Sequence, residues 1–288
     1  MLQSYKEGKA MQLTIEKQLE TFCLHLAESE RSQATMQKYR KEASEFLHFL
    51  EGRPPTKSLV LEYRARLQEQ GRPQTVNAKL SAVHAYLIFC GRADCRVRLM
   101  KVQRRAFLEE RRELSEAEYK RLLQAARARA QERLYLVMLT LCSTGIRVSE
   151  LRYITREAVR RGRAEITLKG KSRVALLPRA LKSRLLDYAV KQGIQSGPIF
   201  HTRGGRPLDR SNICHDMKRL CSAAHVDPAK VFPHNLRHLF ARRFYAVEKN
   251  LAHLADFLGH SSLETTRIYV AASVRTHERT FEKMRLLL

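Results

Sequence analysis

Residues 141–151 read LCSTGIRVSEL, and this stretch sets the framework of the second half of the chain. It completes an apolar stripe over 134–141 whose helical spacing predicts a buried helix. Glycine commonly ends helices, so Gly145 should stop this one and leave Arg147 at the start of another. Glu150 follows one helical turn later, where its carboxylate could hold the Arg147 guanidinium in an ion pair. Taken alone, an arginine near a helix start is usually a surface residue.

Two short β-prone runs follow, AEITL at 164–168 and RVALL at 173–177. Because Lys169-Gly170-Lys171-Ser172 lies between them, we predict a small antiparallel hairpin with lysine at its tip. Lysine is common in hairpin turns, so this motif by itself assigns no function. Further helices are predicted at about 209–224, 233–248, 251–258 and 262–270. The second half is therefore expected to be mainly helical with a small sheet.

Two motifs near the end of the chain contain histidine. PHNLRH places His234 and Arg237 three residues apart, on one face of a helix. LGHSSLETTRIY places His260 nine residues before Tyr269. Each motif also has an ordinary interpretation, namely a surface pair on a basic helix and a half-buried core tyrosine.

The first ninety or so residues read as four helices, interrupted by Gly52-Arg53-Pro54-Pro55 and by Gly71-Arg72-Pro73. Short connections favour a compact helical bundle. We therefore predict a helical domain at 1–95, a basic linker at 96–113 and a second domain at 114–288. The fold class is mainly α, with one small antiparallel sheet in the second domain.

The charge balance points to a polyanionic partner. Lys and Arg total 54 and Asp and Glu total 29, so the net charge is 54 − 29 = +25. Nucleic acid and anionic membrane both fit such a charge. No run approaches the roughly 18 apolar residues that span a bilayer, and the N-terminus lacks a signal-peptide pattern. We expect a cytoplasmic protein that binds nucleic acid.

The six cysteines include no Cys-x-x-Cys pair, so no metal site is expected. Cleavage of a phosphodiester without a metal requires three things: cations for the non-bridging oxygens, a nucleophile, and an acid for the leaving oxygen. Arginine suits the first task, because its planar fork donates two parallel hydrogen bonds and stays protonated. The four motifs together supply all three.

The order Arg, Lys, His-x-x-Arg, His, Tyr resembles the tyrosine recombinases, also called the phage integrase family. LCSTGIRVSEL, the hairpin lysine, PHNLRH and LGHSSLETTRIY carry this resemblance, which extends over about 114–269 and includes Gly205-Arg206-Pro207-Leu208. The first domain resembles the core-binding domain of that family. The whole resembles the two-domain arrangement of Xer-type and small transposon or prophage enzymes.

The resemblance implies a role for each matched residue. Tyr269 would attack the scissile phosphate and form a 3′-phosphotyrosyl link. Arg147 and Arg237 would clamp the non-bridging oxygens, and His260 would donate a further hydrogen bond to them. His234 would accept, or help to accept, the proton of the tyrosine.

The resemblance also implies that a hairpin lysine protonates the leaving 5′ oxygen and that Glu150 holds Arg147. We favour Lys169, because in this family the lysine usually precedes a glycine. Lys171 is the alternative, since a shift of the turn could exchange the two. The covalent link conserves the bond energy, so neither ATP nor a metal or other cofactor is expected.

The expected activity is site-specific recombination of double-stranded DNA, in the integration or excision of a mobile element or the resolution of DNA. A homotetramer and an accessory directionality protein are the expected partners. The tail at 272–288 has an apolar helical stripe, which could fold back on its own domain or, as the resemblance favours, dock on a neighbouring protomer. Two other functions fit part of the pattern. A type IB topoisomerase resembles this family in its Arg, Lys, Arg, His and Tyr chemistry, and the composition alone permits a non-catalytic DNA-binding protein on the same fold.

Overall fold

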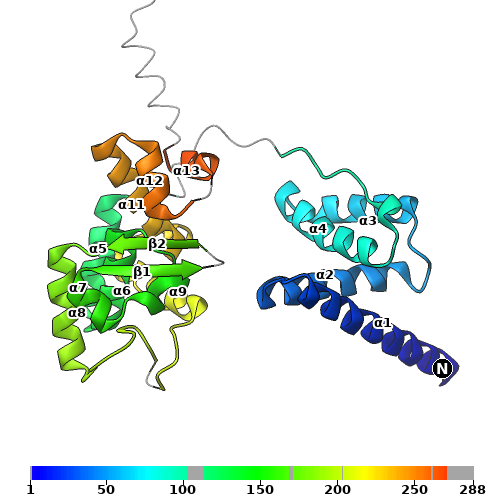
Figure 1. Ribbon diagram of the computed structural model, residues 1–288, viewed down its shortest axis with the longest axis horizontal. Coiled ribbons are helices and arrows are strands. Elements are labelled where there is room, and N and C mark those ends of the chain that lie inside the picture. Colours follow the sequence, from blue (N-terminus) through cyan, green and yellow to red (C-terminus); the bar gives the residue numbers. More distant parts are fainter. Residues whose placement is uncertain (1, 103–112, 169–170, 203, 261, 271–288) are drawn as a thin grey trace, which may run out of the picture. The chain divides into compact units, whose positions relative to one another are not determined.

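The computed structural model describes residues 2–102, 113–168, 171–202, 204–260 and 262–270 (Figure 1). Contacts divide the chain into two compact units, residues 1–104 and 105–288. The predicted class is confirmed: the described residues form helices and one two-stranded antiparallel sheet. Within the same ranges, no helix has both the length and the apolar character that a bilayer crossing requires.

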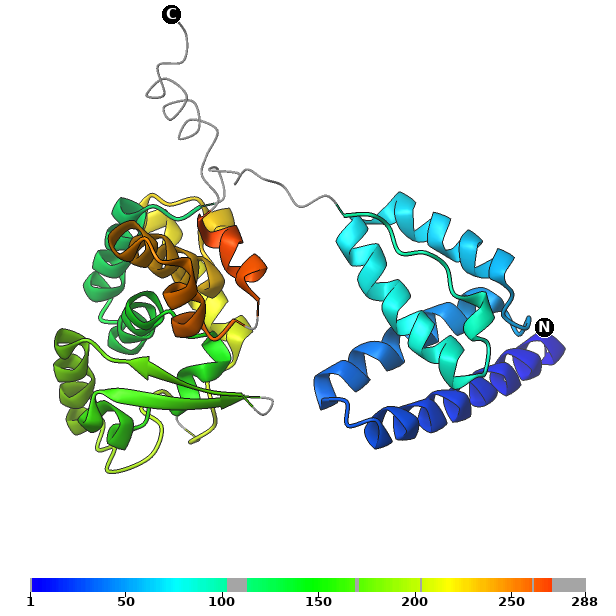
Figure 2. The ribbon, with the colours of Figure 1, turned by 45° about the horizontal axis from the view of Figure 1, so that its top comes forward.

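The first unit is a helical bundle, as predicted. Side chains cap two of its helices, with Ser32 accepting from the amide of Thr35 and Thr56 from that of Leu59. Helix α2 packs against both α1 and α4 (Figure 2). Phe22, Phe46, Leu80 and Leu87 are fully buried at its centre. The elements are α1 (Leu2–Glu28), α2 (Gln33–Leu50), α3 (Lys57–Gln70), α4 (Pro73–Phe89) and the 3-10 turn η1 (Ala93–Cys95).

The second unit is built around helix α6, which packs against α5, α8, α9 and α11. Buried residues of the apolar stripe, among them Met138 and Leu141, form its inner face. The helices are α5 (Glu116–Ala128), α6 (Glu132–Thr144), α7 (Arg156–Arg161), α8 (Arg179–Lys191), α9 (Arg210–Lys218), α10 (Cys221–Ala224), α11 (Pro233–Glu248), α12 (Leu251–Leu258) and α13 (Leu263–Val270), with 3-10 turns η3 (Val148–Tyr153) and η4 (Pro228–Lys230).

One local expectation is wrong, and a second can be made more specific. The single helix predicted at about 209–224 is divided into α9 and α10, because the chain turns at Arg219 and Leu220, where the Leu220 amide bonds to the carbonyl of Met217. The helix expected to start at Arg147 is present, and it is of the 3-10 type, since the Glu150 amide bonds to the Arg147 carbonyl three residues back.

The predicted hairpin is present as β1 (Arg163–Leu168) and β2 (Lys171–Leu176). Leu168 pairs with Lys171, so Lys169 and Gly170, which lie outside the described residues, connect the strands. The strands alternate as a half-buried sheet should: Ile166 and Ala175 are buried, whereas Val174 is exposed.

Gly145 ends α6 for two separate reasons. Its φ of +64° is in the left-handed region, which a side chain rarely adopts. A Cβ at this position would also lie 2.3 Å from a ring carbon of Phe240 on α11. The absence of a side chain therefore lets α11 approach the end of α6, and this approach sets the geometry described below.

We predict that Gly145→Ala destabilises the protein more than Gly162→Ala. Gly162 has a similar φ of +76° but nothing within 4 Å of its Cβ position. An alanine at position 162 would therefore have the strain of the left-handed backbone but no steric clash. That strain costs roughly 1–2 kcal/mol. The clash with Phe240 should add about 1–3 kcal/mol, the typical cost of overpacking. Urea unfolding measures both, and Phe240→Leu should recover part of the difference. Equal costs at the two glycines would contradict the packing argument.

Candidate active site

Glu150 is the buried centre of the first part of the site. Only 1% of its side chain is exposed, against 41% for Arg147. Its Oε2 accepts from the Arg147 backbone amide at 2.7 Å, and its Oε1 accepts from Arg147 Nη1 at 3.1 Å. The ion pair expected from the sequence spacing therefore forms. It holds one edge of the guanidinium, while the rest of that group stays accessible to solvent.

Arg237 is almost fully buried, with 1% exposed, and it joins the ends of two helices to α11. Its Nη1 donates to the carbonyl of Gly145 at 2.6 Å, and its Nη2 donates to the carbonyl of Leu258 at 2.7 Å. The last carbonyls of a helix have no partner within the helix and lie at the negative end of its dipole. The buried guanidinium of Arg237 supplies hydrogen-bond donors to these carbonyls at the ends of both α6 and α12.

His260 follows α12 and is held between two groups. Arg237 Nη2 lies 2.9 Å from its Nε2, and because a guanidinium can only donate, Nε2 must be the acceptor. The ring proton is then on Nδ1, which donates to Oγ1 of the buried Thr266 at 2.8 Å. Desolvation, followed by repulsion from Arg237, Arg147 and Arg173, lowers the pKa of His260 to about 4. The imidazole is therefore neutral at pH 7.

His234 and His238 stand in the first two turns of α11, with ring centroids 4.8 Å apart. The pKa of His234 is lowered by desolvation, then by Arg237, Arg147 and Arg210. Desolvation, with repulsion from His234 and neighbouring arginines, lowers the pKa of His238 to about 3. Both rings are neutral at pH 7, and a neutral imidazole can accept a proton.

Arg173 on β2 belongs to this cluster, although it is not among the residues predicted from the sequence. Its Nη2 donates to Glu150 Oε2 at 2.5 Å, and its Nη1 donates to the carbonyl of Phe257 at 3.0 Å. Strand alternation could have indicated it, because Arg173 shares a face with the buried Ala175 and not with the exposed Val174. His238 and Thr266 were missed as well, although His238 follows His234 by one helical turn.

Three predicted residues are described only in part or not at all. Lys169 lies outside the described residues. Lys171 and Tyr269 are described through their backbones, in β2 and in the last turn of α13. Tyr269 follows Thr266 by three residues, and Thr266 bonds to His260. The backbone that carries the predicted nucleophile is thereby tied to the arginine cluster.

The cluster suits an anion, because Arg147 and Arg173 both pair with the one carboxylate of Glu150. Arg237 adds a third guanidinium, which bonds to backbone carbonyls and to His260. Arg147 and Arg237 lower the pKa of both His234 and His260, so their positive field extends across the site. A phosphate would be attracted by that field. Among the described residues, no group of three or more His, Cys, Asp or Glu is arranged to hold a metal ion.

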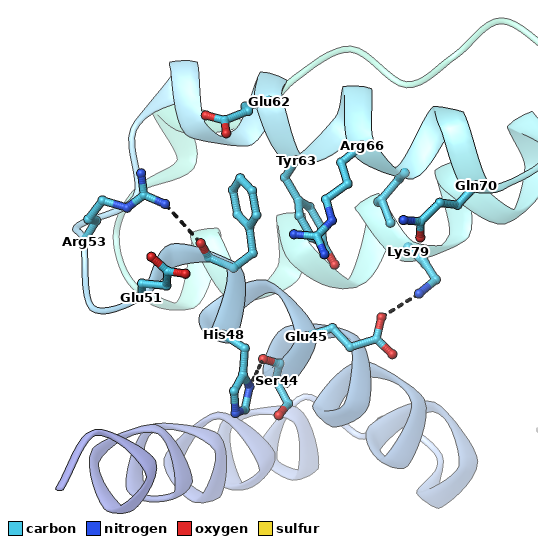
Figure 3. Close-up of a pocket in the computed structure, with 12 residues that line it drawn as sticks. Ser44, Glu45, His48, Glu51, Arg53, Glu62, Tyr63, Arg66, Gln70 and Lys79 are labelled. Carbon is cyan, nitrogen blue, oxygen red and sulfur yellow. Dashed lines mark hydrogen bonds and ion pairs between the residues drawn. The ribbon is translucent and has the colours of Figure 1, made fainter. Parts of the chain in front are cut away.

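The first unit has a hollow of a different character, with a volume of about 800 Å³ between α2 and α3 (Figure 3). Its basic groups are largely matched by acids: Lys79 contacts Glu45 at 2.6 Å and Glu42 at 3.1 Å. The charged residues of its wall are Glu45, Glu51, Glu62, Arg53, Arg66 and Lys79. Acidic and basic residues are equal in number in this wall, whereas arginine is in excess in the cluster of the second unit. The hollow is therefore the weaker candidate for an anion site.

Comparisons with known proteins agree with the geometry. Residues 112–275 match the phage integrase family, and residues 19–93 match the phage integrase N-terminal SAM-like domain. The chain is 28% identical to the tyrosine recombinase XerA of Pyrococcus furiosus over 278 residues, which cover 93% of this chain and 94% of that protein.

Two solved structures show the same fold at low sequence identity. One is the XerH site-specific recombinase bound to its difH substrate before cleavage, with a TM-score of 0.69, 17% identity, and coverage of 93% of this chain and 84% of that one. The other is a lambda integrase tetramer bound to a Holliday junction, with a TM-score of 0.69, 18% identity, and coverage of 88% and 76%.

We predict that His238 makes the protein less stable in acid. An unfolded histidine takes up a proton below its usual pKa of 6.5, whereas folded His238 does so only near 3. The contribution of neutral, buried His238 to the free energy of unfolding is therefore complete above pH 6.5. It is lost as the pH falls toward 3. Between pH 7 and 5 the wild type should lose up to about 2 kcal/mol more stability than His238→Asn. Urea unfolding at the two pH values measures this, and equal losses would contradict the burial of a neutral ring.

Proposed function

The chain belongs to the phage integrase family, and on that premise we propose that it is a site-specific recombinase that cuts and rejoins double-stranded DNA through a 3′-phosphotyrosyl intermediate. The observation that carries this proposal is the arginine cluster around Glu150, placed beside the helix that carries Tyr269. A protein that only binds DNA needs surface cations, but it needs neither Tyr269 nor two arginines placed beside neutral histidines.

In the proposed reaction, the Tyr269 oxygen bonds to phosphorus and the bond from phosphorus to the 5′ oxygen breaks. His234, neutral at pH 7, accepts the tyrosine proton, and Lys169 gives a proton to the leaving oxygen. Arg147 binds a non-bridging oxygen with the accessible part of its fork. The number of phosphoester bonds is unchanged, so resealing by the reverse attack needs no nucleotide.

Arg237 and His260 must change their hydrogen bonds for this chemistry. In the free protein Arg237 donates to His260 Nε2, which leaves that nitrogen unable to donate. We propose that the phosphate takes the place of Nε2 as the acceptor for Arg237. The phosphate charge would also raise the pKa of His260, because a nearby anion favours the protonated ring. The resulting imidazolium could then donate from Nε2 to the second non-bridging oxygen.

Assembly is a further part of the proposal. The lambda integrase structure that shares the fold is a tetramer on a Holliday junction. We propose a tetramer for this chain too, with the tail at 272–288, which lies outside the described residues, docked on a neighbouring protomer. Action on a mobile element, an accessory directionality protein and a cytoplasmic location stay predictions from the sequence.

Tyr269→Phe should bind target DNA as the wild type does but form no covalent adduct, because it lacks the attacking oxygen. The measurement uses a nicked substrate whose cleavage product diffuses away, in chelator and without nucleotide, with denaturing gels to detect the adduct. Tyr188→Phe on α8, outside the cluster, is the matched control and should form adduct normally. An adduct that persists in Tyr269→Phe would exclude this tyrosine as the nucleophile. Relaxation of supercoils without strand exchange by the wild type would indicate a topoisomerase.

Lys169→Ala should slow cleavage strongly, whereas Lys171→Ala should have a milder effect. A substrate with sulfur at the 5′ bridging position needs little protonation to leave, so it should restore cleavage by the variant that has lost the acid. Single-turnover rates with oxygen and sulfur substrates test this for both variants. Rescue of Lys171→Ala, and not of Lys169→Ala, would reverse the assignment.

A further inference from the structure

Arg173 makes contacts on both sides of the cluster. One guanidinium nitrogen donates to Glu150, the carboxylate that holds Arg147. The other donates to the carbonyl of Phe257, at the end of α12. The next carbonyl, that of Leu258, accepts from Arg237. Two arginines from β2 and α11 therefore hold consecutive carbonyls directly before His260.

The aliphatic part of the Arg173 side chain is also closely packed. Gly259 has a φ of +64°, and a Cβ at this position would lie 2.4 Å from Cδ and 2.6 Å from Nε of Arg173. The arginine stem thus packs against the backbone immediately before His260. With only 11% of its side chain exposed, Arg173 has little surface left for DNA.

We propose that Arg173 is a positioning residue, which sets Arg147 through Glu150 and His260 through the end of α12 in one fixed arrangement. This inference rests on the proposed function and adds to it a residue that acts without touching the DNA. Because Arg173 lies on β2, it also joins the strand that begins at Lys171 to both of these groups.

The shape of the guanidinium is what this role requires. Glu150 Oε2 accepts from both the Arg147 amide and Arg173, so loss of Arg173 leaves a buried carboxylate one donor short. Lysine would keep the positive charge, but its single nitrogen cannot reproduce the two fixed directions in which the Arg173 fork donates. Charge and geometry can therefore be separated by substitution.

The experiment compares Arg173→Met, Arg173→Lys and the control Arg163→Met. Arg163 lies exposed at the far end of the same hairpin. Three properties are measured: adduct formation at saturating nicked DNA, affinity for a half-site, and the pKa of His260 by NMR titration of the full chain.

We expect Arg173→Met to form adduct up to about a hundredfold more slowly, as when reacting groups are misplaced by around 1 Å. Half-site affinity should stay close to that of the wild type, since the buried side chain does not reach DNA. The pKa of His260 should rise, because one of the cations that lower it is gone. Arg173→Lys should keep that pKa low and yet remain slow, and Arg163→Met should match the wild type in all three measurements.

Several outcomes would overturn the inference. These are adduct formation at the wild-type rate in both Arg173 variants, an equal defect in Arg163→Met, or a defect confined to DNA affinity. If Arg173→Met does not fold, Arg173→Lys carries the test; if neither folds, Arg173 serves folding and the inference fails. Absence of adduct in the wild type would instead count against the proposed function. The His260 titration would then still test Arg173, because an unchanged pKa of His260 in Arg173→Met would exclude the proposed coupling between these two residues.

Discussion

A carboxylate with almost no access to water needs cations around it, and Glu150 is such a carboxylate in this protein. Burial of an ionised carboxyl costs several kcal/mol unless hydrogen bonds and opposite charge offset it. The Arg147 backbone, the Arg147 side chain and Arg173 provide that compensation. Compensation of the buried Glu150 charge therefore holds these arginines in place. The same ion pair also positions the solvent-accessible part of the Arg147 guanidinium.

Helix ends provide the second constraint. Helices α6 and α12 both finish in the cluster, and their terminal carbonyls would be costly to bury without donors. Arg237 and Arg173 supply those donors at Gly145, Leu258 and Phe257. Two arginines of the cluster thus also complete the secondary structure, and the proposed phosphate contact of Arg237 is built directly on the ends of α6 and α12.

Local patterns in the sequence predicted the structural features that involve residues close together in the chain. The ion pair of Arg147 with Glu150 follows from a spacing of three residues, and the hairpin follows from its two β-prone runs. Contacts between distant segments gave no such local sign. Arg237 bonds to a carbonyl 92 residues away, and Arg173 bonds to one 84 residues away, so these partners could not be predicted from the residues next to either arginine. The roles of the site residues came from resemblance, because spacing alone cannot identify a nucleophile.

The contact between Gly259 and Arg173 has a consequence for how such a protein can change over generations. A side chain at position 259 would occupy the space of the arginine stem and would also be strained by the φ of +64°, so a mutation there would displace Arg173. Loss of the Arg173 contact would in turn leave Glu150 without one of its donors. A change at any one of positions 150, 173 and 259 is therefore expected to disturb the other two, although these positions lie far apart in the sequence.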